Sequence, residues 1–287
     1  MSNFIAVIAN ERFAPGLVAF LNSYKLSGSK TPIVLIDTGL EKKYPVYTIK
    51  KQFSHNRFSS WQNKIAKAEW MYDYSPYLQI ELGELLAEVC ADEILYLEAD
   101  MLVLDNIDHL FDYITENNFI SVMDDAAAII DCEAASDLFV IDSAGRYFRE
   151  GSELRNKYKH HKGWNGGLIG GTRDMYCQMQ GCFYEYLEEY EPQYRLLAQS
   201  YINQYFIEND IIVRDIGFQY NFSGINEYYE MPELYTIKQY PDGYNVRFMN
   251  FPVSIPHFTG KNKPFFSKEK NVMSPVFDFY YNEGRLL

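Results

Sequence analysis

Two short apolar segments, residues 4–9 and 32–36, flank a stretch in which apolar side chains recur at helical spacing. Pro15 suits the first turn of that helix, and Gly28 suits its end. Two strands joined through one helix pair in parallel, because the helix carries the chain back to the end where the first strand began. This order predicts an α/β domain with a parallel sheet at its centre.

The pattern extends over most of the chain. Further strands are predicted at residues 93–97, 119–123, 164–171 and 211–215, and helices at residues 61–72, 77–89 and 185–206. Residues 126–162 show no period, and such a stretch inside a domain is typical of a lid or a disordered loop. We expect one mixed α/β domain over residues 1–265, followed by a C-terminal extension over residues 266–287.

Charge and composition argue against several classes of protein. The formal net charge of −13 over 287 residues disfavours a nucleic-acid-binding protein, which needs a basic surface for the phosphates. No apolar run approaches the roughly 20 residues that span a bilayer, and the first residues lack the charged region of a signal peptide. The four cysteines show no CxxC spacing and fit a reducing compartment. We expect a cytoplasmic protein without a transmembrane segment.

Two carboxylates follow the predicted strand at residues 93–97. Glu98 and Asp100 are separated by one residue and can converge on a divalent cation once the chain turns. Open α/β sheets bind ligands beyond the carboxyl ends of their strands, which is where this pair falls. Carboxylate oxygens suit Mg²⁺ or Mn²⁺, and such a cation would bridge a diphosphate. The alternative is a solvated strand end, because acid-x-acid triplets are common by chance.

Two further motifs offer groups that suit the same ligand. Residues 257–265 (HFTGKNKPF) combine His257, a candidate metal ligand, with Gly260 and lysines for a diphosphate. Asn165 and the two glycines after it lie in the predicted strand at residues 164–171, where the amide can bond sugar hydroxyls and the glycines admit a ligand. A structural histidine and a bulged strand are the simpler alternatives for each motif taken alone.

Together these motifs resemble the glycogenin-like retaining glycosyltransferases of family 8, most closely the bacterial lipopolysaccharide galactosyltransferases. That family pairs a strand ending in D-x-D with a later H-x-x-G-x-x-K-P. Here the two motifs are ILYLEAD and, from His257 to Pro264, HFTGKNKP, in which every position of the second motif is present. Residues 79–100, including LGE, also follow the family, and the resemblance extends over about residues 4–265. It implies a GT-A fold, a Rossmann-like mixed central sheet flanked by helices.

Carried over by position, the resemblance implies a donor site with a divalent metal, Mn²⁺ or Mg²⁺. The implied metal ligands are Glu98, Asp100 and His257. The implied donor-binding residues are Ala9, Asn10, Arg12, Phe13, Gln79, Asp100, Asn165, Gly166, Gly260 and Lys263. The implied catalytic residues are Asp125, Asn203 and Gln204. Phe13 would stack on uracil and Gln204 would lie beside the reacting anomeric carbon, although residues 208–210 offer a competing alignment for the pair at 203–204.

The implied activity is transfer of a hexose, glucose or galactose, from a UDP-sugar to a glycan, a lipid-linked saccharide or a protein, with retention of configuration. Three positions depart from the family: Glu98 replaces Asp, Gln79 replaces Arg or Lys, and Asn203 replaces Asp. These departures support one alternative, a catalytically weak nucleotide-sugar-binding module. A second alternative is a UDP-sugar hydrolase, because the same site would serve transfer to water.

Overall fold

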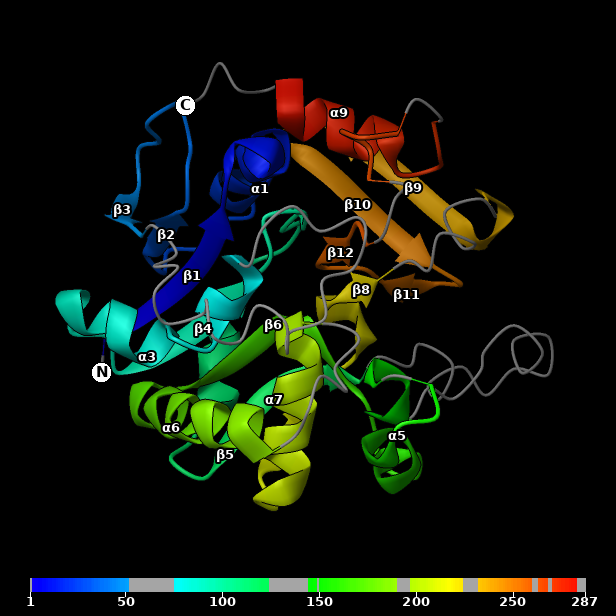
Figure 1. The fold of residues 1–287 in the computed structure, drawn as a ribbon. Coiled ribbons are helices and arrows are strands. Elements are labelled where there is room, and N and C mark those ends of the chain that lie inside the picture. The colour runs from blue at the N-terminus through cyan, green and yellow to red at the C-terminus, as the bar shows by residue number, and fades with distance from the viewer. Residues whose placement is uncertain are drawn as a thin grey trace.

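The computed structural model describes residues 2–51, 75–123, 144–148, 150–189, 197–223, 232–259, 263–267 and 270–282. A seven-stranded sheet in the order β3-β2-β1-β4-β6-β5-β7 forms its centre (Figure 1). The strands are β1 Asn3–Ala9, β2 Ile33–Asp37, β3 Tyr47–Lys50, β4 Glu93–Leu97, β5 Asn118–Met123, β6 Trp164–Thr172 and β7 Ile212–Asp215. Neighbouring strands are parallel except where β6 runs antiparallel to β4 and β5. The predicted mixed central sheet is confirmed, and β6 is the strand that makes it mixed.

Helices cover both faces of this sheet. The α-helices are α1 Ala14–Leu26, α3 Leu82–Leu85, α5 Glu153–Tyr158, α6 Arg173–Glu189, α7 Leu197–Glu208 and α9 Ser274–Asn282. The 3-10 helices are η1 Glu11–Phe13, η2 Ser75–Gln79, η3 Leu86–Val89, η4 Asp108–Tyr113, η6 Ala144–Tyr147, η7 Phe218–Tyr220 and η8 Pro232–Leu234. None of the described helices is both long and apolar enough to cross a membrane.

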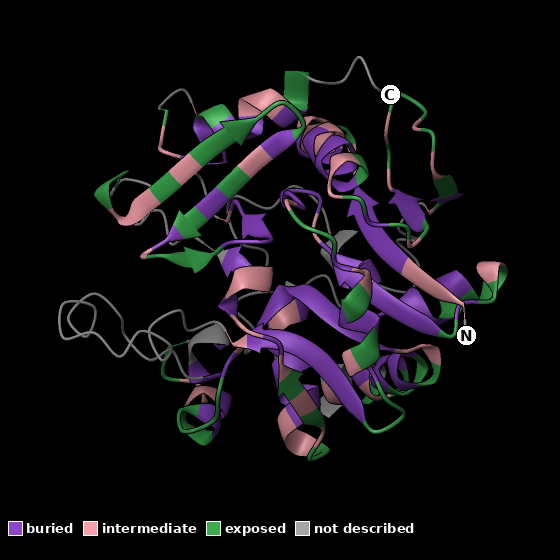
Figure 2. Cartoon of the chain, turned by 180° about the vertical axis from the view of Figure 1, so that it is seen from behind, coloured by how far each residue is buried: buried purple, intermediate pink, exposed green. Residues whose placement is uncertain are grey.

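Side chains of β4 show how the sheet divides the core into two layers. Successive residues of a strand point to opposite faces, so Leu95 and Leu97 pack in the cluster that includes α1. Ile94 and Tyr96 pack in the cluster formed with α3, α6 and α7. Figure 2 shows β4 and its neighbours buried along most of their length, as expected for strands covered on both faces.

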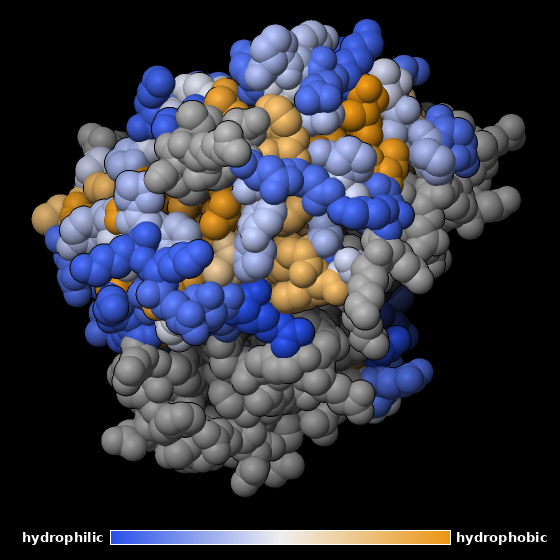
Figure 3. All heavy atoms as spheres, turned by 90° about the horizontal axis from the view of Figure 1, so that it is seen from above, coloured by the Kyte–Doolittle hydropathy of each residue, from blue (hydrophilic) through white to orange (hydrophobic). Residues whose placement is uncertain are grey.

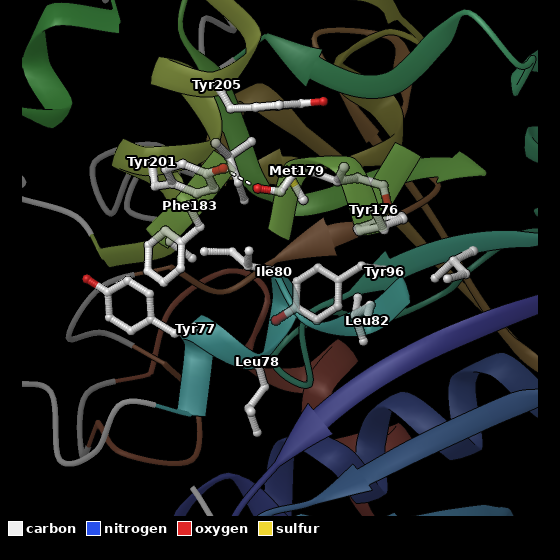
Figure 4. Packing of buried hydrophobic residues seen from close by; sticks show 14 of the residues in the cluster. Tyr77, Leu78, Ile80, Leu82, Tyr96, Tyr176, Met179, Phe183, Tyr201 and Tyr205 are labelled. Carbon is white, nitrogen blue, oxygen red and sulfur yellow. Dashed lines mark hydrogen bonds between the residues drawn. The ribbon is translucent and has the colours of Figure 1, made fainter. Parts of the chain in front are cut away.

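Large aromatic side chains fill the layer between the sheet and helices α6 and α7 (Figure 4). The ring of Phe183 lies 4.6 Å from that of Tyr201 and 5.7 Å from that of Tyr77, in the edge-on and tilted arrangements that aromatic pairs favour. Two of the buried hydroxyls bond to the backbone: Tyr201 donates to the Met179 carbonyl, and Tyr176 donates to the Ile169 carbonyl at 2.8 Å. Several of the 25 tyrosines of the chain therefore have a structural role.

A third cluster lies beside α1. It contains residues of β8 Phe222–Ser223, of the antiparallel strands β9 Tyr235–Tyr240 and β10 Gly243–Phe248, and of helix α9. Strand β11 Phe251–Pro252 pairs antiparallel with β10, and β12 Pro256–His257 pairs parallel with β8. Helix α9 packs on α1, where Asn22 donates to the Tyr280 carbonyl at 2.8 Å (Figure 1). Figure 3 views the molecule from above and shows hydrophobic residues exposed between hydrophilic ones on this face.

Three of the sequence predictions are wrong in their extent. The helix predicted over residues 185–206 instead falls on the end of α6 and most of α7, with residues 190–196 outside the described part of the chain. The helix predicted over residues 77–89 is three short pieces, η2, α3 and η3, because nearly every side chain over residues 77–82 is buried, whereas a straight helix would bury one stripe. The aperiodic stretch at 126–162 is described from residue 144 onward apart from residue 149, and there Phe148 and Leu154 join the core. Residues 61–72, predicted as a helix, lie outside the described part of the chain.

Candidate active site

Glu98 and Asp100 lie directly beyond the end of β4. The backbone N–H of Glu98 donates to the Gly167 carbonyl of β6 at 3.1 Å, which is the last bond of that strand pair. The chain then turns, and the N–H of Met101 donates to the Glu98 carbonyl at 3.2 Å. Because of this turn, both carboxylates can face one point although they are two residues apart, which is the convergence expected from the sequence.

His257 reaches the carboxylates through backbone pairing between residues 100–104 and 254–258. The Leu102 N–H donates to the Pro256 carbonyl at 3.0 Å, and Met101 and His257 form an antiparallel bridge. On its other side β12, which contains His257, pairs with β8 (Figure 1). The imidazole is therefore carried on fixed backbone, which is the support that a metal ligand needs.

The two carboxylates and the imidazole form one cluster. His257 Nε2 lies 2.8 Å from Glu98 Oε2 and 3.4 Å from Asp100 Oδ1. One ligand atom from each residue lies within 4.8 Å of the other two. Asp100 and His257 are buried, whereas the Glu98 side chain is 36% exposed, so the cluster meets solvent on the Glu98 side.

The ligand atoms of this cluster suit a divalent cation. Asp100 Oδ1 is buried and accepts no hydrogen bond from the described residues; its contact there is the approach of His257 Nε2. Burial alone would lower the pKa of His257, but the carboxylates of Asp100 and Glu98 outweigh it and raise that pKa to about 9. The cluster thus attracts positive charge, and two carboxylate oxygens with one imidazole nitrogen suit Mn²⁺ or Mg²⁺.

Lys263 closes the cluster on the side away from His257. Its ammonium donates to Asp100 Oδ2 and, at 2.8 Å, to the Phe258 carbonyl, and the side chain is buried. Burial would raise the pKa of Asp100, but the charges of Lys263 and His257 hold it below its usual range. Asp100 therefore remains ionised between an imidazole and an ammonium group.

The predicted base-binding residues lie next to Lys263. The ammonium of Lys263 is 5.5 Å from the centre of the Phe13 ring, and Arg12 lies 4.6 Å over the ring of Phe266. Asn10 caps η1 by accepting from the Phe13 N–H at 3.3 Å, and Ala9 ends β1, where it is buried. The first loop and the segment after His257 thus meet in space, although they are at opposite ends of the sequence.

The first residues of β6 line the other side of the cluster. Asn165 is buried, and its Oδ1 accepts from the Gly167 N–H at 2.7 Å and from Asn221 Nδ2 at 2.9 Å. Gln79, also buried, donates to the Gly166 carbonyl at 2.7 Å. In this structure both predicted donor-binding amides therefore bond to the protein itself and hold the strand beside the metal ligands.

The predicted catalytic residues differ in how they are placed. The side chain of Asn203 accepts from the Trp164 N–H at 2.8 Å and donates to the Trp164 carbonyl at 2.9 Å and the Gln199 carbonyl at 2.8 Å. An aspartate could not donate to these two carbonyls, which explains an asparagine at this position. Gln204 is buried on α7, which packs against β6. Asp125 and Gly260 lie outside the described residues.

Asn221 is a residue of this site that the sequence did not reveal. It follows η7 and precedes β8, and its Oδ1 lies 2.9 Å from Nδ1 of His257. No motif or periodicity marks the position, because the contact depends on the pairing of β8 with β12.

Two solved structures of glycosyltransferases share this architecture. One is the galactosyltransferase LgtC in complex with donor and acceptor sugar analogues, with a TM-score of 0.62, 16% identity, and coverage of 98% of this chain and 95% of that one. Another is the apo form of the glycosyltransferase GlyE of Streptococcus pneumoniae TIGR4, with a TM-score of 0.57, 13% identity, and coverage of 97% and 59%. At such identities the likeness shows the fold, which is the GT-A fold expected from the sequence.

The sequence itself supplies the family. None of the curated proteins matches the chain significantly. The model of glycosyl transferase family 8, in contrast, matches residues 5–269, which include the carboxylate pair, the β6 glycines and the segment from His257 to Lys263. The chain therefore belongs to glycosyl transferase family 8 and is a glycosyltransferase.

Proposed function

We propose that this enzyme transfers a hexose, glucose or galactose, from a UDP-sugar to a saccharide, lipid-linked or protein acceptor, with retention of configuration. The observation that carries the proposal is the cluster of Glu98, Asp100 and His257, with Lys263 on the second oxygen of Asp100. Acidic oxygens beside a lysine suit the opposite charges of a divalent cation and a diphosphate. In support, the structure of LgtC is a complex with donor and acceptor sugar analogues.

In this proposal Glu98, Asp100 and His257 hold Mn²⁺ or Mg²⁺, which when bound neutralises charge on the leaving diphosphate. Lys263, together with Gly260, binds the diphosphate through its ammonium group. On donor binding the ammonium exchanges its bond with Asp100 for bonds with phosphate oxygens. The residues Ala9, Asn10, Arg12 and Phe13 bind the uracil and its ribose, with the Phe13 ring against the base.

We assign the sugar end of the donor to residues on β6, α7 and the loop after β5. Asn165, Gly166 and Asp125 contact the sugar, and the carbonyl of Gln204 stabilises the positive charge that develops on the anomeric carbon. The bond from that carbon to the diphosphate breaks as the acceptor oxygen bonds to the same face. The acceptor proton passes to the departing diphosphate. Asn203 and Gln79 act through the backbone of β6, which they hold in place.

Calorimetric titration with UDP, with and without Mn²⁺, tests the donor site. We expect binding that depends on Mn²⁺ and is lost in Asp100→Ala and in His257→Ala, because both ligands lie inside the cluster. Asp174→Ala is the matched control, since that carboxylate is 82% exposed on α6. Failure of the wild-type protein to bind UDP under either condition would overturn the UDP-sugar proposal.

Product analysis then separates transfer from the two alternatives. A UDP-hexose incubated with and without saccharide acceptors should give a new glycosidic product only when an acceptor is present. Free hexose formed at the same rate in both cases would identify a hydrolase. Tight UDP binding without either product would identify a binding module, in which Gln79 and Asn203 have become purely structural.

Location and domain limits are also proposals. Cys90, Cys177 and Cys182 are free thiols, which supports the reducing cytoplasm as the site of action. We keep residues 1–265 as the catalytic domain and residues 266–287 as its C-terminal extension. Helix α9 within the extension packs on α1, so we expect its removal to destabilise the domain.

A further inference from the structure

A chain of hydrogen bonds leads from the backbone of β6 to the imidazole of His257. The Gly167 N–H donates to Asn165 Oδ1 at 2.7 Å, and Asn221 Nδ2 lies 2.9 Å from the same oxygen. Asn221 Oδ1 then lies 2.9 Å from His257 Nδ1. Asn165, Asn221 and His257 are all buried, at 5%, 3% and 2% exposure, so water does not compete for these bonds.

The Gly167 N–H, at the start of this chain of hydrogen bonds, fixes the donor and the acceptor of every later bond. A backbone amide can only donate, so the atom of Asn165 that it meets must be the carbonyl oxygen. That oxygen can only accept, so Asn221 must present its NH₂ group to it. The oxygen of Asn221 is then the atom that faces His257, and it can only accept a proton from Nδ1. The orientation of both amides follows from this sequence of donors and acceptors.

We propose that Asn221, oriented by Asn165, is the positioning residue that holds a proton of His257 on Nδ1, so that Nε2 is the nitrogen that releases its proton and binds the metal. Nε2 is the nitrogen that lies 2.8 Å from Glu98 Oε2 and 3.4 Å from Asp100 Oδ1. A histidine binds a metal through the nitrogen without a proton, and the bond made by its other nitrogen sets which one that is. The inference rests on the proposed function, because it assigns the support of the proposed metal ligand.

The backbone makes this arrangement rigid. Asn221 immediately precedes β8, and His257 ends β12, the parallel partner of that strand. The Asn221 N–H donates to the Phe218 carbonyl at 3.2 Å, and the next N–H, from Phe222, donates to the Ile255 carbonyl at 2.9 Å. Both ends of the Asn221–His257 bond are thus held by main-chain hydrogen bonds, which keep the ring orientation fixed before a metal arrives.

Two variants test the role of the amide. Asn221→Leu keeps the size of the side chain but removes both bonds, and we expect it to weaken Mn²⁺ binding by roughly 10- to 100-fold, as for other partners of metal-bound histidines. Asn221→Asp keeps an acceptor for Nδ1 and should retain more of the affinity. Asn22→Leu is the control: Asn22 is also buried and donates to a carbonyl, but it lies between α1 and α9. It should leave Mn²⁺ affinity unchanged.

Calorimetry measures the Mn²⁺ affinities, and ¹⁵N-edited NMR of the metal-free protein measures how fast the imidazole Nδ1 proton exchanges with water. We expect this proton to exchange slowly in the wild type, because it is bonded to Asn221, and to lose that protection in Asn221→Leu. A wild-type Nδ1 that carries no protected proton, or an Asn221→Leu variant that is folded and binds Mn²⁺ as tightly as the wild type, would overturn the inference. Wild-type protein that binds no Mn²⁺ would instead count against the proposed function, and the NMR result would still decide the inference. If Asn221→Leu does not fold, Asn221→Asp and the NMR measurement decide it.

Discussion

A Cβ atom added to Gly167 would lie 2.5 Å from Cε1 of His257. The imidazole therefore packs directly on the backbone of β6, and the absence of a side chain at this position is what allows it. The same atom would lie 2.9 Å from the Met101 side chain, so no free space exists to one side. The glycine pair after Asn165 was expected to admit a ligand; Gly167 admits the protein's own candidate metal ligand.

Gly167→Ala should therefore displace His257 and impair metal binding. We expect a loss of about 1 to 3 kcal/mol in the free energy of unfolding, because the new methyl group overpacks the site. Mn²⁺ affinity should fall at the same time. Urea denaturation and calorimetric Mn²⁺ titration measure the two effects.

Gly181→Ala is the matched control for that substitution. A Cβ atom at Gly181, on α6, would meet nothing within 4 Å. Alanine favours helix over glycine by about 1 kcal/mol, so this variant should be slightly more stable, with unchanged Mn²⁺ affinity. Equal behaviour of the two variants would show that His257 does not depend on close packing at Gly167.

Restoring the family's aspartate at position 203 should destabilise this protein. Asn203→Asp removes the hydrogen bonds donated to the carbonyls of Trp164 and Gln199 and leaves a carboxylate near them at a fully buried position. We expect a loss of about 2 to 3 kcal/mol at neutral pH. Such burial raises the pKa of the new carboxyl in the folded state, so the penalty should shrink as the pH falls and the carboxyl becomes protonated.

Urea denaturation at several pH values measures this effect. Asn209→Asp is the control, because Asn209 lies just beyond the same helix and also donates to a carbonyl, but it is exposed. Asn209→Asp should lower the free energy of unfolding by well under half as much as Asn203→Asp. An Asn203→Asp protein as stable as the wild type at neutral pH would contradict the role that we assign to the Asn203 amide.

Lys263→Met should change the affinities for UDP and for Mn²⁺ in opposite directions. The ammonium now occupies one oxygen of Asp100, so its removal frees that oxygen and should strengthen Mn²⁺ binding in the absence of UDP. UDP binding should weaken by roughly 10- to 100-fold, the equivalent of one charged hydrogen bond to phosphate. Lys270→Met, which removes a lysine that is 67% exposed, should change neither affinity. Parallel loss of both affinities in Lys263→Met would contradict the proposed exchange of partners.

Asp108 should contribute stability that depends on pH. It accepts from the Lys30 N–H at 2.8 Å and from the Thr31 N–H and hydroxyl at 3.0 and 2.7 Å. Partial burial alone would raise its pKa, but these bonds outweigh burial and lower the pKa from its usual value. A lowered folded-state pKa means that the stabilisation is complete above the unfolded-state pKa and is lost as the pH falls through the folded-state value.

Asp108→Asn should therefore cost about 1 kcal/mol at neutral pH, a modest value because the carboxyl is partly exposed, and the difference from wild type should disappear in acid. Thermal unfolding at a series of pH values measures it. Asp174→Asn, at a carboxylate that is 82% exposed, should show no such difference. A constant difference across the pH range would mean that the charge of Asp108 does not contribute.

Local sequence predicted most of the sheet and the composition of the candidate site. The apolar segments became β1, β2, β4, β5, β6 and β7, because each is long enough for a strand and bounded by turn residues. The edge strand β3 was missed, since only Ile49 of its four residues is buried and its sequence alternates weakly. The strand–carboxylate order placed Glu98 and Asp100 at the end of β4, where α/β sheets bind ligands.

The sequence by itself determined which residues carry charge, oxygen or imidazole near the strand ends, and the family to which the pattern belongs. Only the tertiary structure decided how the amides are used: Asn203 holds Trp164, Gln79 holds Gly166, and Asn221 holds His257. A side-chain amide can donate through its NH₂ group and accept through its oxygen, so its role depends on which backbone or side-chain groups come within about 3 Å of each. That proximity results from the pairing of segments far apart in the chain, which no local pattern encodes.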